Sequence, residues 1–395
     1  MTTNDILQPC WLLILPAPSS EITLSSLRVA YGPGLSQCLQ NASKVSAGAS
    51  DVVLDVAIAY EDVSNFSYSR VQVLLGLMYK LTCIICTEQH IDLQYDNDVD
   101  IRITFFRDGE EATRPGDVTF QKSVIDLQAL AKINRVWQRL CSLESEIGET
   151  LLRKFLRIKK DSSQHAISDF QIERFAGGVT MLQESPSYSK PEGNAFHRHH
   201  SVAVGGTFDH LHAGHKLLLT MTALVLDPEP SSGWCISVGI TGDELLKNKQ
   251  YREVLESFEQ RLSAVRNFLL DILELISPTH TLQSTSRVES SGPHGRTVHD
   301  VLKSGLNVKY VEIFDPCGPT LTEESITGLV LSGETRKGGE FVNEKRDEKG
   351  WHALEVFEVD VLDTEGEAGN QSQIDDKYQS KISSTDIRRR VLQRS

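Results

Sequence analysis

Two kinds of segment alternate in the second half of the chain, and this alternation constrains the fold most. Short segments of strand pattern, at 202–204, 235–240 and 308–314, are separated by longer segments of helical pattern. Within 258–275, apolar residues recur every three or four positions, as on the buried face of a helix. Strands that alternate with helices of this length favour a parallel sheet with helices on both faces. We therefore predict a doubly wound, parallel-sheet α/β domain.

The remaining segments predict a second domain ahead of this one. Residues 11–15 and 52–59 suit buried strands, and 100–106 alternates as a half-buried strand does. Residues 71–86 predict a helix running into a strand, and 124–160 has a helical pattern. We predict an N-terminal α/β domain (1–160), a polar linker (161–200) and a C-terminal domain (201–395). Within the C-terminal domain we expect further strands at 329–331 and 354–361, a helix at 217–226 and an acidic surface insertion at 360–376.

Charge and composition exclude several classes of protein. The 395 residues carry 54 acidic and 40 basic side chains, a net charge of −14, which is unlike a protein that binds nucleic acid along its backbone. We find no uninterrupted apolar run of the roughly 18–20 residues that span a membrane, and no basic residue before the apolar run at 11–15. Seven scattered cysteines do not resemble a disulfide framework. We expect a cytoplasmic protein with no nucleic-acid or membrane partner.

The most informative stretch follows the strand at 202–204. Gly205 and Gly206 lack Cβ atoms, so a phosphate can approach their backbone closely. A helix that begins near Gly214 points its N-terminal amides at the same place. Thr207 adds a hydroxyl, and His212 and His215, three residues apart, can both face the anion. This combination predicts a phosphate site at the carboxyl end of the strand.

Metal binding is the alternative interpretation of the histidines. His210, His212 and His215 could be zinc ligands, but zinc gives no reason for the Gly-Gly turn. The histidines at 197, 199 and 200 lack a companion cysteine or carboxylate cluster, so we interpret them as part of the linker. Cys83 and Cys86 have the spacing of a redox or zinc pair, but their apolar surroundings favour buried thiols. We predict no protein-held metal.

The stretch His212-Ala213-Gly214-His215 resembles the HxGH signature of the nucleotidyltransferase superfamily, and Ile382-Ser383-Ser384-Thr385-Asp386-Ile387-Arg388 resembles the second signature of its adenylyltransferase branch. The runs at 205–216, 238–249, 315–319 and 329–335, with Asn343 and Arg346, are similar to the eukaryotic and archaeal pantetheine-phosphate adenylyltransferases. The resemblance covers residues 201–395 and implies a Rossmann-like fold. It also implies adenylyl transfer from ATP to 4'-phosphopantetheine, giving dephospho-CoA and pyrophosphate.

The resemblance also assigns roles to individual residues. His215 and Thr207 would contact the reacting phosphates, and Lys247 or Lys249 would neutralise the acceptor phosphate. The ATP-binding set would be Gly205, Gly206, Phe208, His212, Gly214, Ser383, Ser384, Thr385 and Arg388, with Arg388 beside the β- and γ-phosphates. Mg²⁺ would accompany ATP, held mostly by phosphate oxygens and water.

Departures from the family pattern keep alternatives open. Bacterial members place arginines where this chain has residues 332–335, and Arg336 or Lys337 would have to replace them. Nicotinamide-mononucleotide adenylyltransferases share the second signature, and cytidylyltransferases share the first. In animals the related domain is fused to a kinase, whereas this chain ends at Ser395, so we expect a monofunctional enzyme. The N-terminal domain has no assigned role, and a scaffold that holds other coenzyme A enzymes is the rival from another class.

Overall fold

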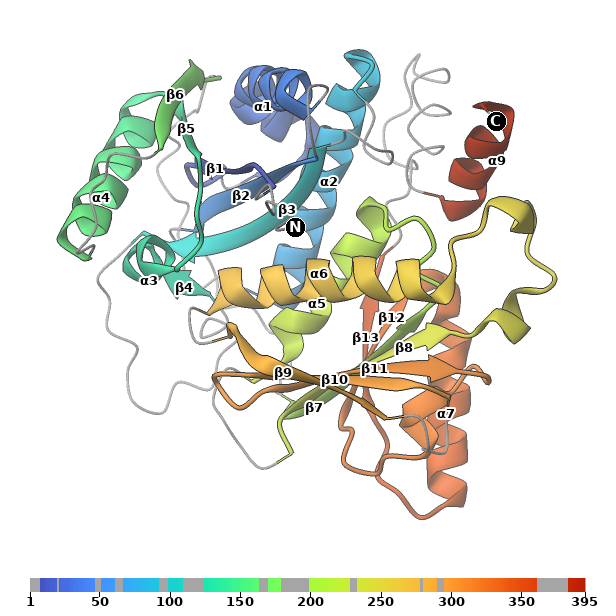
Figure 1. Cartoon of the computed structure of the whole chain (residues 1–395). Coiled ribbons are helices and arrows are strands. Elements are labelled where there is room, and N and C mark those ends of the chain that lie inside the picture. Colours follow the sequence, from blue (N-terminus) through green and yellow to red (C-terminus); the bar gives the residue numbers. More distant parts are fainter. Residues whose placement is uncertain are drawn as a thin grey trace, which may run out of the picture. The chain divides into compact units, whose positions relative to one another are not determined.

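The computed structural model describes residues 8–19, 21–46, 51–60, 67–91, 99–108, 124–162, 170–178, 199–227, 233–277, 280–289, 295–360 and 383–394. It separates into an N-terminal and a C-terminal unit, each built around its own sheet. The predicted α/β class is confirmed for both (Figure 1). Most of the expected linker, including His197, and the expected insertion beyond Asp360 lie outside the described residues.

The N-terminal sheet contains six parallel strands in the order β4-β3-β2-β1-β5-β6. The strands are β1 (Cys10–Leu15), β2 (Val52–Tyr60), β3 (Val99–Arg107), β4 (Ile125–Asp126), β5 (Arg139–Glu144) and β6 (Gln171–Ala176). The helices are α1 (Leu24–Ser46), α2 (Tyr68–Glu88), α3 (Leu127–Lys132) and α4 (Glu146–Ser162). Every residue of β1 and β2 is buried, as the largely apolar runs predicted, including the carboxylate of Asp55 in β2.

Three expectations for this unit differ from the structure. Residues 71–86 lie wholly in α2, without a strand. The helical pattern at 124–160 is interrupted by β5, a central strand that pairs with β1. Strand β6 falls inside the stretch expected to be linker, so the N-terminal sheet includes Gln171–Ala176. Helix α2 is long and apolar enough to cross a membrane by length and composition, and 72% of its apolar window is buried within the protein.

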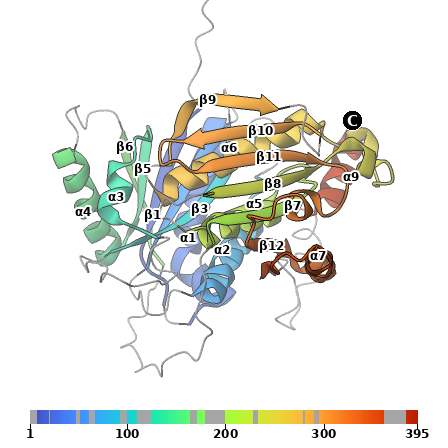
Figure 2. The ribbon, with the colours of Figure 1, turned by 90° about the horizontal axis from the view of Figure 1, so that it is seen from below.

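The C-terminal sheet has seven strands in the order β13-β12-β7-β8-β11-β10-β9, and Figure 2 shows those from β12 to β9 side by side. The strands are β7 (Ser201–Gly206), β8 (Cys235–Thr241), β9 (Leu282–Glu289), β10 (Thr297–Leu302), β11 (Asn307–Ile313), β12 (Gly328–Ser332) and β13 (Glu355–Val359). The five from β13 to β11 are parallel, but β10 runs antiparallel to both β11 and β9. The expected parallel sheet is therefore extended by an antiparallel edge.

Helices cover the two faces of this sheet. They are α5 (Ala213–Val225), α6 (Phe258–Ile276), α7 (Arg336–Glu348) and α9 (Ser384–Arg394), with short 3₁₀ turns η4 (Asp243–Leu246), η5 (Arg252–Val254), η6 (Gly318–Leu321) and η7 (Gly333–Thr335). Helix α6 begins with a complete capping box between Ser257 and Gln260. The chain leaves β7 toward β8 on one side of the sheet and leaves β12 toward β13 on the other. The strand order therefore reverses between the neighbouring strands β7 and β12.

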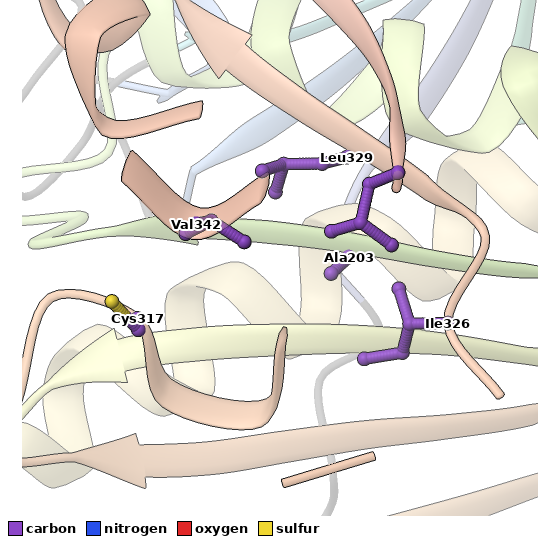
Figure 3. Packing of buried hydrophobic residues seen from close by; sticks show 6 residues of the cluster. Ala203, Cys317, Ile326, Leu329 and Val342 are labelled. Atoms are coloured by element: carbon purple, nitrogen blue, oxygen red, sulfur yellow. The ribbon is translucent and has the colours of Figure 1, made fainter. Parts of the chain in front are cut away.

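A small core under α7 joins the central strands to η6. Figure 3 shows Ala203 of β7, Leu329 of β12 and Val342 of α7 turned toward one another, with Cys317 and Ile326 at the edge. All are at most 9% exposed. Close packing here fixes the loop at 315–326 against the carboxyl half of the sheet, where the candidate site lies.

Candidate active site

A cavity of about 870 Å³ opens at the carboxyl ends of β7, β8, β11 and β12. This is where open parallel sheets bind ligands, beside the point at which strand order reverses. Of the predicted site residues, Phe208 and Lys247 are not among those lining the cavity. The lining contains Gly205, Gly206, Thr207, His212, Gly214, His215, Lys249, Ser383, Ser384, Thr385 and Arg388.

Phe208 supports the cavity wall from inside the core. It is fully buried with a positive φ of 53°, and its ring lies 5.4 Å from that of His215, centre to centre. A Cβ atom at Gly206 would lie 3.1 Å from the ring of Phe208, so only glycine fits there without displacing the ring. The expectation that Phe208 binds ATP therefore does not agree with its position; it packs beneath Gly206 and His215.

The two histidines of the HxGH motif lie one over the other. Their ring centres are 3.8 Å apart, and the ring planes differ by 22°. Burial, and then the neighbouring His210, lower the pKa of His215 to about 3. Burial and the charges of nearby histidines and Lys216 also hold the pKa of His212 well below its ordinary value. Both imidazoles are neutral near pH 7, because burial disfavours a positive charge on either ring and two charged rings would also repel each other.

Ser384 sets the tautomer of His212. Its hydroxyl donates to the carbonyl oxygen of Asp209 at 3.0 Å and lies 3.2 Å from Nε2 of His212. A hydroxyl carries one hydrogen, so Ser384 accepts from His212, and Nε2 of His212 carries the proton. The Nδ1 atoms of His212 and His215 are buried and have no hydrogen-bond partner within the described segments. With the proton on Nε2, the Nδ1 of His212 carries a lone pair and can only accept a hydrogen bond.

The start of α5 adds backbone donors to the site. His212 occupies the N-cap position, but its side chain makes no capping hydrogen bond. The first turn contains no acidic residue. The amides that follow and the positive end of the helix dipole therefore favour an anion.

The structure distinguishes the two candidate lysines. Lys249 lines the cavity, whereas Lys247 pairs with Glu244 and its side chain is 58% exposed. Both lysines follow β8, and the 3₁₀ turn η4 between the strand and the lysines determines which one faces inward. Lys249 is thus the lysine placed to neutralise a phosphate.

Arg388 borders the cavity but is committed to the protein. Its side chain is 2% exposed and forms an ion pair with the fully buried Asp209. Its Nε also donates to the carbonyl of Gln250 at 2.9 Å. The geometry therefore differs from the expected contact with the β- and γ-phosphates.

Arg261 is a residue that sequence reasoning missed. It is fully buried, and one terminal nitrogen donates to the carbonyls of Thr207 at 2.9 Å and Thr241 at 2.7 Å. It thereby joins the carboxyl ends of β7 and β8, and Asp243 accepts from its other terminal nitrogen at 3.1 Å. The only sequence signal was a charge beside the apolar stripe of α6.

The wall formed by residues 332–335 carries Glu334 instead of the bacterial-type arginine. Arg336 pairs with Glu358, and neither Arg336 nor Lys337 is among the residues lining the cavity. Arg346 is buried elsewhere and donates to backbone carbonyls of the 320–326 segment and of His352, so it holds η6 in place. Apolar side chains such as Leu331, Phe341 and Val342 complete the wall.

Among the described residues, no group of three or more histidine, cysteine, aspartate or glutamate side chains is arranged to hold a metal ion. Glycine backbone, helix amides, a lysine and neutral imidazoles instead surround one cavity. Fold and site together define an α/β protein whose cavity, at the reversal point of its sheet, has groups suited to a phosphorylated ligand.

Comparisons with known proteins narrow this class. A family model described as Cytidylyltransferase-like matches residues 203–390, and a domain of unknown function (DUF8446) matches residues 1–181. An uncharacterized protein of Schizosaccharomyces pombe is 36% identical over 186 residues, covering 47% of this chain and 46% of its own length. Phosphopantetheine adenylyltransferase of Saccharomyces cerevisiae is 35% identical over 218 residues, 55% of each chain.

The corresponding enzyme of Pyrobaculum aerophilum is 31% identical over 195 residues, which cover 49% of this chain and 92% of that protein. Through its C-terminal half, the chain belongs to the phosphopantetheine adenylyltransferase family of nucleotidyltransferases. The resemblance read from the motifs is confirmed. The match spans about half the length of the Schizosaccharomyces and Saccharomyces relatives.

Proposed function

We propose that the chain transfers the adenylyl group of ATP to 4'-phosphopantetheine, releasing pyrophosphate and forming dephospho-CoA. The observation that carries the proposal is the meeting of the HxGH motif, Lys249 and the 383–385 segment around one cavity. Family membership supports the same reaction. We further propose that residues 201–395 form the transferase domain and that the enzyme acts in the cytoplasm.

The reaction requires positioning and charge stabilisation, without a covalent enzyme intermediate. An oxygen of the acceptor phosphate attacks the α-phosphorus of ATP, and the bond to the bridging oxygen breaks with its electron pair leaving on pyrophosphate. Lys249 offsets the charge of the acceptor phosphate. His215 and Thr207, which face the cavity at the end of β7, stabilise the α-phosphate as its charge develops.

Other groups hold the ATP triphosphate. The amides at the start of α5 donate to its oxygens, and Ser383, Ser384 and Thr385 border it at the start of α9. His212 lines the same site with its Nε2–H donated to Ser384. Mg²⁺ would accompany ATP, held mostly by phosphate oxygens and water, and would reduce the repulsion between the two phosphorylated substrates. In this scheme no protein carboxylate cage is required.

Pyrophosphate release by the purified full-length chain tests the proposal. The protein is given Mg-ATP with 4'-phosphopantetheine, with nicotinamide mononucleotide, or with no acceptor. We expect release with 4'-phosphopantetheine alone, and a loss of about 10²–10³-fold in kcat for His215→Ala, as for removal of one charge-stabilising donor. His200→Ala is the matched control, because its side chain is 52% exposed and does not line the cavity.

Two results would overturn the proposal. Release with the mononucleotide would keep the fold and change the substrate. An His215→Ala variant with turnover close to that of the wild type would remove the histidine from the mechanism. Association of the N-terminal domain with other enzymes of coenzyme A synthesis stays a prediction, to be tested by identifying proteins that co-purify with the full chain.

A further inference from the structure

Asp209 lies at the centre of a strained turn between β7 and α5. The residues on either side of it, Phe208 and His210, have positive φ angles of 53° and 47°. Residues other than glycine rarely adopt this conformation, so the surrounding structure must hold the turn. Asp209 is fully buried, and both its side chain and its backbone carbonyl are engaged.

Helix α9 reaches Asp209 through two side chains one turn apart. The hydroxyl of Ser384 donates to the backbone carbonyl of Asp209 at 3.0 Å, and Arg388 pairs with its carboxylate. Three of the five N–H groups of Arg388 are engaged within the protein, one of them by Asp209. Its Nε donates to Gln250, and its remaining terminal nitrogen lies 3.2 Å from the hydroxyl of Thr385.

A third segment, residues 250–256, meets the same turn. The amide of Glu256 donates to the carboxylate of Asp209 at 2.9 Å, and the carboxylate of Glu256 accepts from the amide of His210 at 2.6 Å. The imidazole of His210 lies 3.0 Å from the carbonyl of Val254. The turn at Asp209 is therefore held by α9 on one side and by the 250–256 segment on the other.

We propose that Asp209 and Arg388 are positioning residues that couple the docking of α9 to the arrangement of the HxGH histidines. The link to the histidines is Ser384, which contacts both Asp209 and Nε2 of His212. When the ion pair between Arg388 and Asp209 is broken, α9 is no longer held against the turn. Ser384 then loses its contact with His212, and the turn at 208–210 relaxes. The expected effect on kcat rests on the proposed function, whereas the coupling between α9 and the histidines can be measured in the protein without substrates.

The substitutions Asp209→Asn, Arg388→Gln and the double variant test the coupling, with Arg389→Gln as the matched control. Arg389 is the next residue on α9, is 49% exposed and pairs with Asp386 on its own helix. For each single variant we expect kcat to fall by about 10²-fold, the cost of a misplaced catalytic group, with a smaller change in the KM for ATP. The double variant is expected to be no worse than either single one, since both remove the same link.

Amide hydrogen exchange of the full-length free protein gives a readout that does not depend on activity. We expect Asp209→Asn to increase exchange in residues 384–391 and 208–215 together, by about 10²-fold, because it leaves a buried guanidinium unpaired. Ser384→Ala leaves no buried charge and therefore keeps the test interpretable if Asp209→Asn fails to fold. It should loosen the same two segments to a smaller extent.

Opposite outcomes would overturn the proposal. If Arg388 were a direct phosphate ligand, Arg388→Gln would raise the KM for ATP while Asp209→Asn left it unchanged, and Arg388→Lys would retain much of the activity. Exchange that increases in α9 alone, with residues 208–215 still protected, would also refute the coupling. Absence of adenylyl transfer in the wild type would instead refute the proposed function, and the exchange result would still decide the coupling.

Discussion

Alanine at Gly206 should disturb the site, whereas alanine at the adjacent Gly205 should not disturb the fold. A Cβ at Gly206 would lie 3.1 Å from two carbons of the Phe208 ring and 3.3 Å from a third. Carbon atoms in contact are normally about 3.5–4.0 Å apart, so the ring must withdraw by about 0.5 Å. At Gly205 the nearest atom would be the carbonyl oxygen of Gly239, at 3.9 Å.

The magnitude follows from this difference in space. Overpacking of a buried site costs about 1–3 kcal/mol, and glycine to alanine at a permissive site stabilises by about 0.4–1 kcal/mol. We therefore expect Gly206→Ala to have a free energy of unfolding about 2 kcal/mol below that of Gly205→Ala. Because Phe208 packs on His215, a shift of about 0.5 Å should also lower kcat about tenfold.

Urea unfolding of the two full-length variants measures the first quantity, and pyrophosphate release with saturating substrates measures the second. Gly205→Ala is read for stability only, because its methyl group would occupy part of the cavity. Equal unfolding curves for the two variants would show that Phe208 yields without cost. The steric role assigned to Gly206 would then be wrong.

Two further predictions concern charge. Lys249→Ala should lower kcat/KM for the acceptor by at least about tenfold. Lys247→Ala removes only an exposed ion pair with Glu244 and should change kcat/KM less than about twofold. Equal effects of the two substitutions would show that Lys249 is not the lysine that faces the acceptor. Because the pKa values of His212 and His215 are lowered in the folded protein, the unfolded chain binds more protons than the folded one below pH 6.5. The free energy of unfolding should therefore decrease as the pH is lowered from 6.5, by about 1.4 kcal/mol per pH unit for each histidine. For His215 this decrease should continue down to about pH 3. Urea unfolding between pH 7 and pH 4 should show a shallower decline in His215→Gln, and an unchanged slope would contradict the assignment.

Local patterns account for the parts of the fold that the sequence predicted. The strands at 202–204 and 235–240 are buried on both faces and are almost wholly apolar. Strand β11 instead alternates, with Lys309 and Glu312 only half-buried. The edge strand β9 has the sequence Leu-Gln-Ser-Thr-Ser-Arg-Val-Glu, without an apolar run, and was missed. Helix α1 was missed for another reason: its buried apolar residues recur every four positions, but the Gly32-Pro33-Gly34 sequence in its middle is typical of a turn.

The same distinction applies to the candidate site. The turn, the helix start and the two histidines lie within ten residues and could be read from the sequence. Asp209 and Arg388 are 179 positions apart, and no spacing rule relates them. A motif also does not state which way a side chain points: Phe208 turns into the core, and of the two lysines only Lys249 turns into the cavity.

All seven cysteines are buried as reduced thiols, and their distribution between the two units is uneven. Five belong to the N-terminal unit (Cys10, Cys38, Cys83, Cys86 and Cys141), whereas Cys235 and Cys317 belong to the C-terminal unit. A thiol reagent can therefore modify the six cysteines outside the cavity only as their unit opens, and mass spectrometry of the labelled peptides records which unit opened first. The chain carries its own reporters of the order of unfolding, without an introduced label, and Cys317 at the cavity wall also reports whether the cavity is filled.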